Sequence, residues 1–162
     1  MKITVIYDSL HGNTEKIAVA IVGALGLPDD VRALRAGDAG AKDLQEADLA
    51  VVGSPTHGFR ATEAVQALIR SIPGNGLEGV RVAAFDTRIP EKEVGRGLRV
   101  LMKVGGYAAG RIADALEKKG GIPAVPAEGF LVSGREGPLV EGELERAAGW
   151  VKSILEAFSA GR

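Results

Sequence analysis

The sequence contains no cysteine in its 162 residues, and aromatic residues make up only 4% of it. Without cysteine there can be no disulfide framework, thiolate nucleophile, redox-active dithiol, zinc–thiolate site or iron–sulfur cluster. No apolar run approaches the roughly 20 residues that a bilayer-spanning helix needs. These absences exclude disulfide-stapled, thiol-based and membrane-spanning proteins.

An excess of charge of either sign is also missing. The chain carries 20 basic and 21 acidic side chains, with a formal net charge of −1. Proteins that coat nucleic-acid phosphates need a basic excess, so we expect no nucleic-acid partner. The length suits one domain over residues 1–162, and the strand pattern at the start predicts a cytoplasmic protein without a signal peptide.

Short apolar runs alternate with longer segments of helical period along the chain. The predicted strands cover residues 1–7, 31–35, 49–52, 80–85 and 130–132. The first predicted helix is capped by Asn13 or Thr14 and stopped by residues 26–28. The other predicted helices cover residues 41–47, 61–72, 108–119 and 143–160. This β-α repetition predicts an α/β fold with a parallel sheet between two layers of helices.

The segment at residues 89–106 fits the repeat least well. It is too long for an ordinary βα connection, and its basic residues suit a core poorly. It is therefore either an excursion over a site or an extra helical turn packed on the surface. Its basic residues are Lys92, Arg96, Arg99 and Lys103.

The loop after the first strand gathers polar groups where a helix begins. It offers the hydroxyls of Ser9 and Thr14, the amide of Asn13 and the close backbone approach that Gly12 permits. Free N–H groups and the helix dipole favour a phosphate at such a point. Simple helix capping is the alternative, but it requires only one of these groups. The loop therefore favours phosphate binding.

Three familiar phosphate-handling motifs do not match. A P-loop needs Lys and Ser or Thr directly after its last glycine, whereas Asn13 and Thr14 follow Gly12. A dinucleotide fingerprint, G-x-G-x-x-G, is absent after the first strand. A phospho-accepting receiver domain would carry an aspartate at the end of the third strand, where Gly53 and Ser54 stand.

The same segments carry a family resemblance. Residues 5–21, VIYDSLHGNTEKIAVAI, resemble the phosphate-loop signature of the flavodoxin family. The GSPTHG sequence at residues 53–58 looks like the flavin-flanking loop of that family, and residues 128–139 with the final helix fit as well. The resemblance implies a flavodoxin-like, doubly wound, five-stranded parallel sheet in the order 2-1-3-4-5, with three α/β/α layers and bound FMN.

The resemblance also implies a set of cofactor-binding residues. The first loop would hold the FMN phosphate, the loop after the third strand would lie along one face of the isoalloxazine ring, and the residues after the fourth strand along the other face. No catalytic or metal-binding residue is predicted. The predicted cofactor-binding residues are Ser9, Leu10, His11, Gly12, Asn13, Thr14, Ser54, Pro55, Thr56, His57, Gly58, Phe59, Asp86, Thr87 and Arg88.

Some of these residues depart from the family pattern. His11 stands where relatives often carry a second threonine, and His57 where many carry a large side chain beside the ring. The loop after the fourth strand lacks the tyrosine that commonly stacks on the ring, which leaves Phe59, and more distantly Tyr107, as aromatic candidates. At Gly58 we expect a peptide that flips so that its carbonyl accepts a hydrogen bond from the reduced ring; a simple turn glycine is the alternative.

The two histidines of the sequence fall one in each of the first two predicted site loops. They are open to three interpretations: exposed loop residues, cations that favour phosphate and reduced flavin, or part of a metal site that is short of ligands. We expect His57 to tune the flavin.

The implied function is electron transfer between redox partner proteins, namely a flavin reductase and an electron acceptor, by a monomer or weak dimer. The alternatives are an FMN-dependent NAD(P)H:quinone-type oxidoreductase and a non-catalytic regulatory module of the same fold. Carrier flavodoxins are usually strongly acidic, so the near-neutral charge weakens the carrier assignment. Because cysteine is absent, a bound organic cofactor remains as the means of carrying electrons.

Overall fold

The computed structural model describes residues 1–26, 30–90 and 107–161. Its sheet is parallel throughout, in the order β2-β1-β3-β4-β5, and β6 also pairs with β4. This confirms the predicted fold class and strand order. The fifth predicted strand consists of two pieces, β5 and β6, which pair with successive parts of β4. The strands are β1 (Ile3–Tyr7), β2 (Val31–Arg35), β3 (Leu49–Pro55), β4 (Arg81–Arg88), β5 (Ile122–Pro123) and β6 (Glu128–Leu131).

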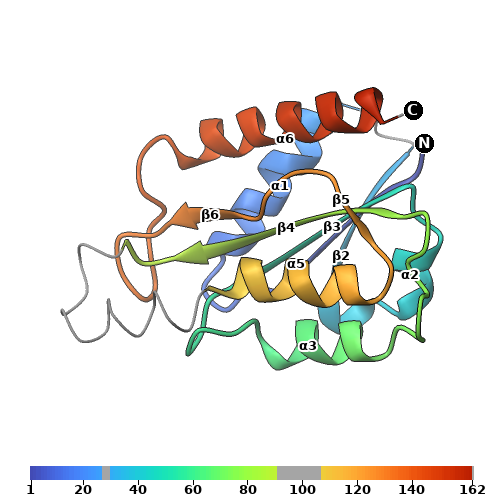
Figure 1. Cartoon of the computed structure of the whole chain (residues 1–162). Helices are drawn as coiled ribbons and strands as arrows, with labels where there is room; N and C mark the ends of the chain where they lie inside the picture. Colours follow the sequence, from blue (N-terminus) through green and yellow to red (C-terminus); the bar gives the residue numbers. More distant parts are fainter. Residues whose placement is uncertain (27–29, 91–106, 162) are drawn as a thin grey trace.

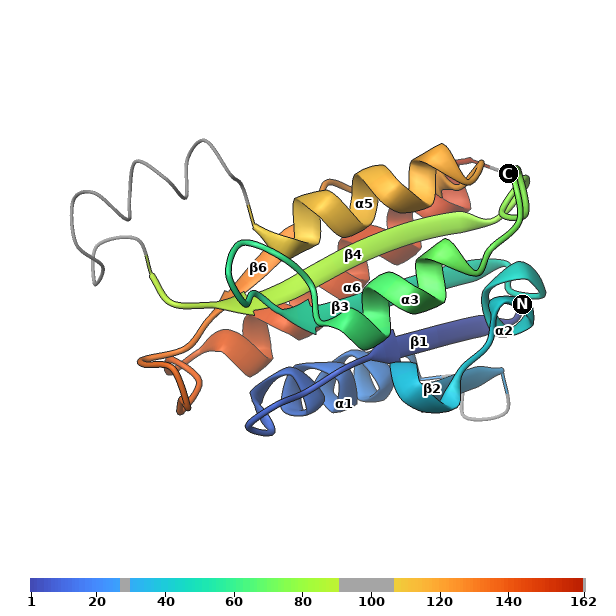
Figure 2. The same ribbon diagram turned by 90° about the horizontal axis from the view of Figure 1, so that it is seen from below.

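Helices cover both faces of the sheet and form the two outer layers (Figure 1). One face carries α1 and α6, and the other carries α2, α3 and α5. Figure 2 shows α3 and α5 side by side on their face. The described helices are α1 (Asn13–Leu25), α2 (Ala41–Gln45), α3 (Glu63–Arg70), α5 (Ala108–Lys118) and α6 (Glu143–Ala160), with a 3₁₀ turn at Ala36–Asp38.

The sheet is buried on both faces because successive strand residues point to opposite sides. In β3, Val51 packs with the α1 and α6 side, whereas Val52 packs with the α3 and α5 side. Both are fully buried, which explains why the strand reads as a continuous apolar run.

Three aromatic side chains lie together on the α6 face. The rings of Phe85, Phe130 and Trp150 meet edge to face, with centroids 6.0–6.1 Å apart. Gly53 makes room for this cluster, since a Cβ there would lie 2.0 Å from a ring carbon of Phe85. Much of the small aromatic content is therefore used in the core.

The outer edge of β6 is covered by side chains of α6. Glu143 accepts the Leu131 N–H at 2.7 Å, and Arg146 donates to the Gly129 carbonyl and to Glu143. Burial would raise the pKa of Glu143, but the hydrogen bonds from Arg146 and Leu131 outweigh it and lower that pKa. At this strand edge the Leu131 N–H and the Gly129 carbonyl therefore find hydrogen-bond partners within the chain.

Two sequence-based boundaries differ from the structure. The N-cap of α1 is Gly12, with φ 88°, so the predicted capping by Asn13 or Thr14 is wrong: both lie in the first turn. Residues 53–55 and 86–88 continue β3 and β4 rather than forming loops, because Ser54 pairs with Asp86. Of the segment at residues 89–106, all but residues 89 and 90 lies outside the described residues.

Candidate functional site

A cleft opens at the carboxyl ends of the strands, at the other end of the sheet from the chain termini (Figure 1). It has a volume of about 110 Å³ and lies where strand order reverses between β1 and β3, the usual ligand position in an open parallel sheet. It is lined by Leu10, His11, Asn13, Thr14, Pro55, Thr56, His57, Thr87, Arg88, Ile89, Val132 and Arg135.

The loop before α1 forms one side of the cleft. Ser9 Oγ accepts the N–H groups of Gly12 at 3.0 Å and Glu15 at 3.3 Å, which folds the loop over the helix start. Within the described part of the chain, no acceptor pairs with the backbone N–H of Asn13 or Thr14, although both residues are buried. Unpaired N–H groups at a helix N-terminus are the donors that an anion such as phosphate satisfies.

The side chains at the start of α1 fix the helix to the neighbouring segments. The Oγ1 atoms of Thr14 and Thr87 lie 2.8 Å apart, so α1 is hydrogen-bonded to the end of β4. Asn13 donates its amide to the carbonyl of Glu136 at 3.0 Å. This bond holds the loop after β6 against the cleft, and Arg135 of the same loop lines it.

A tight turn at residues 57–60 forms the second side. The backbones of His57 and Arg60 exchange hydrogen bonds of 2.8 and 3.1 Å. Gly58 and Phe59 between them have φ values of 56° and 67°, the signature of a type I′ turn. His57 is exposed and lines the cleft, whereas Gly58 acts as a turn glycine in this conformation. The peptide flip at Gly58 stays a prediction.

The end of β4 forms the third side and supports α5. Asp86 is fully buried, and its carboxylate accepts Arg88 at 2.7 and 2.8 Å and the Ala109 N–H at 2.9 Å. Thr56 Oγ1 accepts the Ala108 N–H at 3.1 Å, so both first N–H groups of α5 are capped. Asp86 therefore contributes to the site through Arg88 and α5 rather than by lining the cleft.

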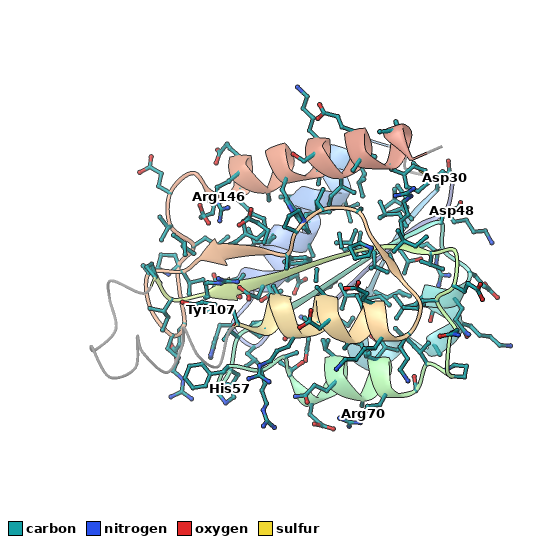
Figure 3. All side chains as sticks on the ribbon, viewed as in Figure 1. Asp30, Asp48, His57, Arg70, Tyr107 and Arg146 are labelled. Atoms are coloured by element: carbon teal, nitrogen blue, oxygen red, sulfur yellow. The ribbon has the colours of Figure 1, made fainter. Side chains whose placement is uncertain are left out.

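The guanidinium of Arg88 has a fixed position. It is chelated by Asp86 and stacked on the ring of Tyr107, with its central carbon 3.6 Å from the ring centroid. Tyr107 and His57 lie at the same end of the molecule (Figure 3). Tyr107, the second aromatic candidate from the sequence, thus holds the guanidinium of Arg88 in the wall of the cleft.

The charge of the cleft lining is of one sign. The described residues that line it include the arginines Arg88 and Arg135 and the two histidines, and none is Asp or Glu. Such a lining favours an anionic ligand.

The structure brings nine of the fifteen predicted residues into the cleft lining. The other six lie in the same segments but do not line it. Among these, Ser54 is fully buried, and its hydroxyl bonds the Pro55 carbonyl and the Thr62 N–H at the start of α3. The residues outside the lining are Ser9, Gly12, Ser54, Gly58, Phe59 and Asp86.

Sequence reasoning missed three lining residues, namely Ile89, Val132 and Arg135. Val132 and Arg135 follow β6, whose carboxyl end lies beside that of β4. The sequence could have indicated Val132 and Arg135, because all parallel strands end at the same edge of the sheet and the loop after each strand is a candidate for the site. The predicted site residues come only from the segments that follow the first, third and fourth strands.

Within residues 1–26, 30–90 and 107–161, no three metal-ligating side chains gather at one point. His11 and His57 line the same cleft. None of the helices in that described part is long and apolar enough to cross a membrane.

Comparison with known proteins identifies the fold and the family. The family model described as Flavodoxin matches residues 5–86. A short-chain flavodoxin associated with a non-canonical PDU bacterial microcompartment is 17% identical, with TM-score 0.74 over 98% of this chain and 99% of that one. A flavodoxin from the domain Archaea is 24% identical, with TM-score 0.72 over the same shares. Oxidised Flavodoxin 1 from Bacillus cereus is 15% identical, with TM-score 0.74 over 96% and 98%. At these identities the structures establish the fold alone. A comparison with curated proteins finds no match.

Proposed function

We propose that this chain, which belongs to the flavodoxin family, binds FMN in the cleft and carries electrons between redox partner proteins. Flavodoxins are known to bind FMN and to pass electrons to partners. The observation that carries the proposal is the start of α1, where two buried N–H groups lack an acceptor among the described residues and face a cleft without acidic lining.

The donors at this point suit a phosphate group. Ser9 Oγ accepts two N–H groups and keeps its own hydrogen to donate. In the pair formed by Thr14 and Thr87, one hydroxyl hydrogen is used and the other stays available. Gly12 is in the left-handed region, with open space where a Cβ would stand. Ser9, Asn13 and Thr14 would thus hold the phosphate together with the helix N-terminus.

The remaining walls would hold the ring. FMN, when bound, supplies a group that accepts and releases one or two electrons. The turn at residues 57–60 would lie along one side, and the positively charged Arg88 at the other side would favour added negative charge. Residues 1–162 would form one FMN-binding domain.

The composition of the lining supports a second candidate, an FMN-dependent NAD(P)H:quinone-type oxidoreductase. None of the described residues lining the cleft is Phe, Tyr or Trp. A ring held without aromatic walls would be open to a small acceptor. A protein that takes up no FMN would instead be a regulatory module of the same fold.

Two measurements on the purified protein test the proposal. Titration of the apoprotein with FMN should give a flavin spectrum and a saturable dissociation constant, with riboflavin bound more weakly because it lacks the phosphate. Stopped-flow mixing with NADPH then separates the candidates. Slow reduction by NADPH alone, accelerated by an added reductase, supports the carrier; rapid unassisted reduction supports the oxidoreductase. Absence of FMN uptake contradicts both.

A further inference from the structure

Basic side chains line the proposed FMN site and a groove beside it. Next to the cleft, a groove of about 310 Å³ runs between α3 and α5, on the other side of the turn at residues 57–60. Among the described residues lining the groove, as among those lining the cleft, there is no Asp or Glu. Together the two linings contain five arginines and both histidines: Arg60, Arg70, Arg88, Arg111, Arg135, His11 and His57.

Some of these charges are neutralised by partners in the chain, and some are not. Arg88 pairs with the buried Asp86, and Arg70 pairs with Glu63. Arg60 and Arg135 are exposed and form no ion pair with the residues that the structure describes. Exposed acids also lie close to them in sequence: Glu136 follows Arg135, and Glu63, which pairs with Arg70, lies three residues after Arg60.

A pocket at the opposite end of the molecule has a different lining. Asp30 and Asp48 lie at the end where the chain termini are, away from His57 and Tyr107 (Figure 3). The pocket at that end is lined by three acids and two bases: Asp30, Asp43, Glu46, Lys2 and Arg32. Among the described residues, the linings of the cleft and the groove thus lack the acids that this pocket contains.

We propose that the redox partner docks over the site through an acidic protein surface, which contacts a basic rim made of His57, Arg60 and Arg135. This inference rests on the proposed function and specifies its partner. The field at the rim would raise the rate of encounter with an acidic surface and repel a basic one. Docking there would bring the partner directly over the cleft.

The groove beside the rim offers an apolar contact of the kind that a protein surface uses. Its floor includes Ala61, Ile69, Ile112 and Ala115, with Arg60 and Arg111 beside them. An interface commonly combines such an apolar centre with a charged periphery. A small phosphorylated ligand would use the arginines and leave the apolar floor without a contact, so the observations favour a protein partner.

The first test needs no FMN. A glutamate-rich peptide is titrated into the isotope-labelled apoprotein, and amide shifts are expected at the rim. The double charge reversal Arg60→Glu with Arg135→Glu should weaken binding about tenfold or more at low salt. The matched control, Lys118→Glu with Lys152→Glu, changes the net charge equally on exposed helix positions outside both linings, and should change binding little. Equal losses in both variants, or tighter binding of a DNA duplex to the rim, would overturn the proposal.

The second test uses the FMN-loaded protein and two small oxidants of opposite charge. The reduced protein should react with hexacyanoferrate(III) at a rate that falls as salt is added, and with tris(phenanthroline)cobalt(III) at a rate that rises. The rim double variant should reverse both trends. The opposite trends in the native chain would refute the basic rim. If no FMN is taken up, the proposed function fails, while the peptide titration still decides the rim.

Discussion

Helices α1 and α5 begin at the same end of the sheet, yet their first N–H groups are satisfied in opposite ways. At α5, Thr56 accepts the Ala108 N–H and the buried Asp86 carboxylate accepts the Ala109 N–H. At α1 the N-cap is a glycine, and within the described chain nothing accepts the N–H groups of Asn13 and Thr14. The chain supplies an anion to one helix and leaves the other open, so of these two helices it is α1 whose start is suited to an external anion.

Helix α6 extends the comparison to a third helix start. Its N-cap, Gly142, has a φ of 91°, close to the 88° of Gly12 at α1. The backbone geometry is therefore shared, and the difference lies in the side chains. Glu143 in the first turn of α6 is buried and bonded to Leu131 and Arg146, whereas the acid in the first turn of α1, Glu15, pairs with Arg35. A left-handed glycine alone thus does not mark a binding site.

The largest expected effect comes from removing the internal anion at α5. Asp86→Ala leaves Arg88 without its carboxylate and removes the acceptor of the Ala109 N–H, and we expect a loss of about 3 kcal/mol in the free energy of unfolding. Urea denaturation measures it. Glu63→Ala is the control, since its pair with Arg70 is exposed and should be worth about 0.5 kcal/mol or less. Equal small losses in both variants would show that Asp86 does not hold α5.

The acid at α6 should have the next largest effect, and that effect depends on pH. Glu143→Gln removes charge-assisted hydrogen bonds, and we expect a loss of about 2 kcal/mol at neutral pH. The pKa of Glu143 is lowered in the folded chain, so its contribution is complete above the ordinary value of 4.5 and disappears as the pH falls through the folded value. The stability difference from the native chain should therefore narrow below pH 4.5.

The control for this prediction lies in the same turn. Glu145 is exposed, so Glu145→Gln should change the free energy of unfolding by less than about 0.5 kcal/mol. Urea denaturation of both variants over a range of pH provides the comparison. A constant difference between Glu143→Gln and the native chain down to acidic pH would contradict the assigned role.

The fold could be predicted from the sequence because the spacing of apolar residues distinguishes strands from helices and gives their order along the chain. The strands that end in loops were harder to delimit, since Ser54 and Asp86 are polar yet continue their strands fully buried. The Ser54 hydroxyl is satisfied by Thr62, and the Asp86 carboxylate by Arg88 and by Ala109, which lies 23 residues away and is brought near only by the fold. A polar residue after an apolar run resembles a loop until those partners are known.

Only part of the candidate site could be predicted from the sequence, because only that part is built from residues that follow one another in the chain. The phosphate loop is continuous in sequence, so its hydroxyls, glycine and helix start could be read together. Arg135 reaches the cleft through a loop that Asn13 fixes by a hydrogen bond to Glu136, across more than a hundred residues of chain. Likewise, the stacking of Tyr107 on Arg88 depends on where α5 begins. Contacts between residues so far apart in the chain leave no pattern in the sequence from which they could be predicted.

A charge placed at the start of α1 would make that helix more like α5. His11→Asp adds an anion to the exposed loop just before Gly12, so it should compete with a bound phosphate. We expect FMN affinity to fall about tenfold, which corresponds to about 1.4 kcal/mol, while the stability of the apoprotein stays the same or rises slightly. Fluorescence titrations measure the affinity, and urea denaturation the stability.

Riboflavin provides the control for this variant, because it has the ring but no phosphate. Its affinity should be nearly the same in the native chain and in His11→Asp. The neutral substitution His11→Asn should weaken FMN binding less than the acid does. Parallel losses for FMN and riboflavin would mean that His11 acts on the ring, and the contrast between the starts of α1 and α5 would then not explain phosphate binding.

The smallest expected effect concerns the far side of the cleft, where His57 is exposed. A basic side chain near the ring would favour the reduced, more negative flavin, so His57→Ala should lower the reduction midpoint by a few tens of millivolts. Redox titrations of the native chain and the variant measure it. His11→Ala is the matched control, since it removes the other histidine of the cleft from the phosphate side and should affect FMN affinity more than the midpoint. An unchanged midpoint in His57→Ala would show that the turn at residues 57–60 positions the ring without tuning it.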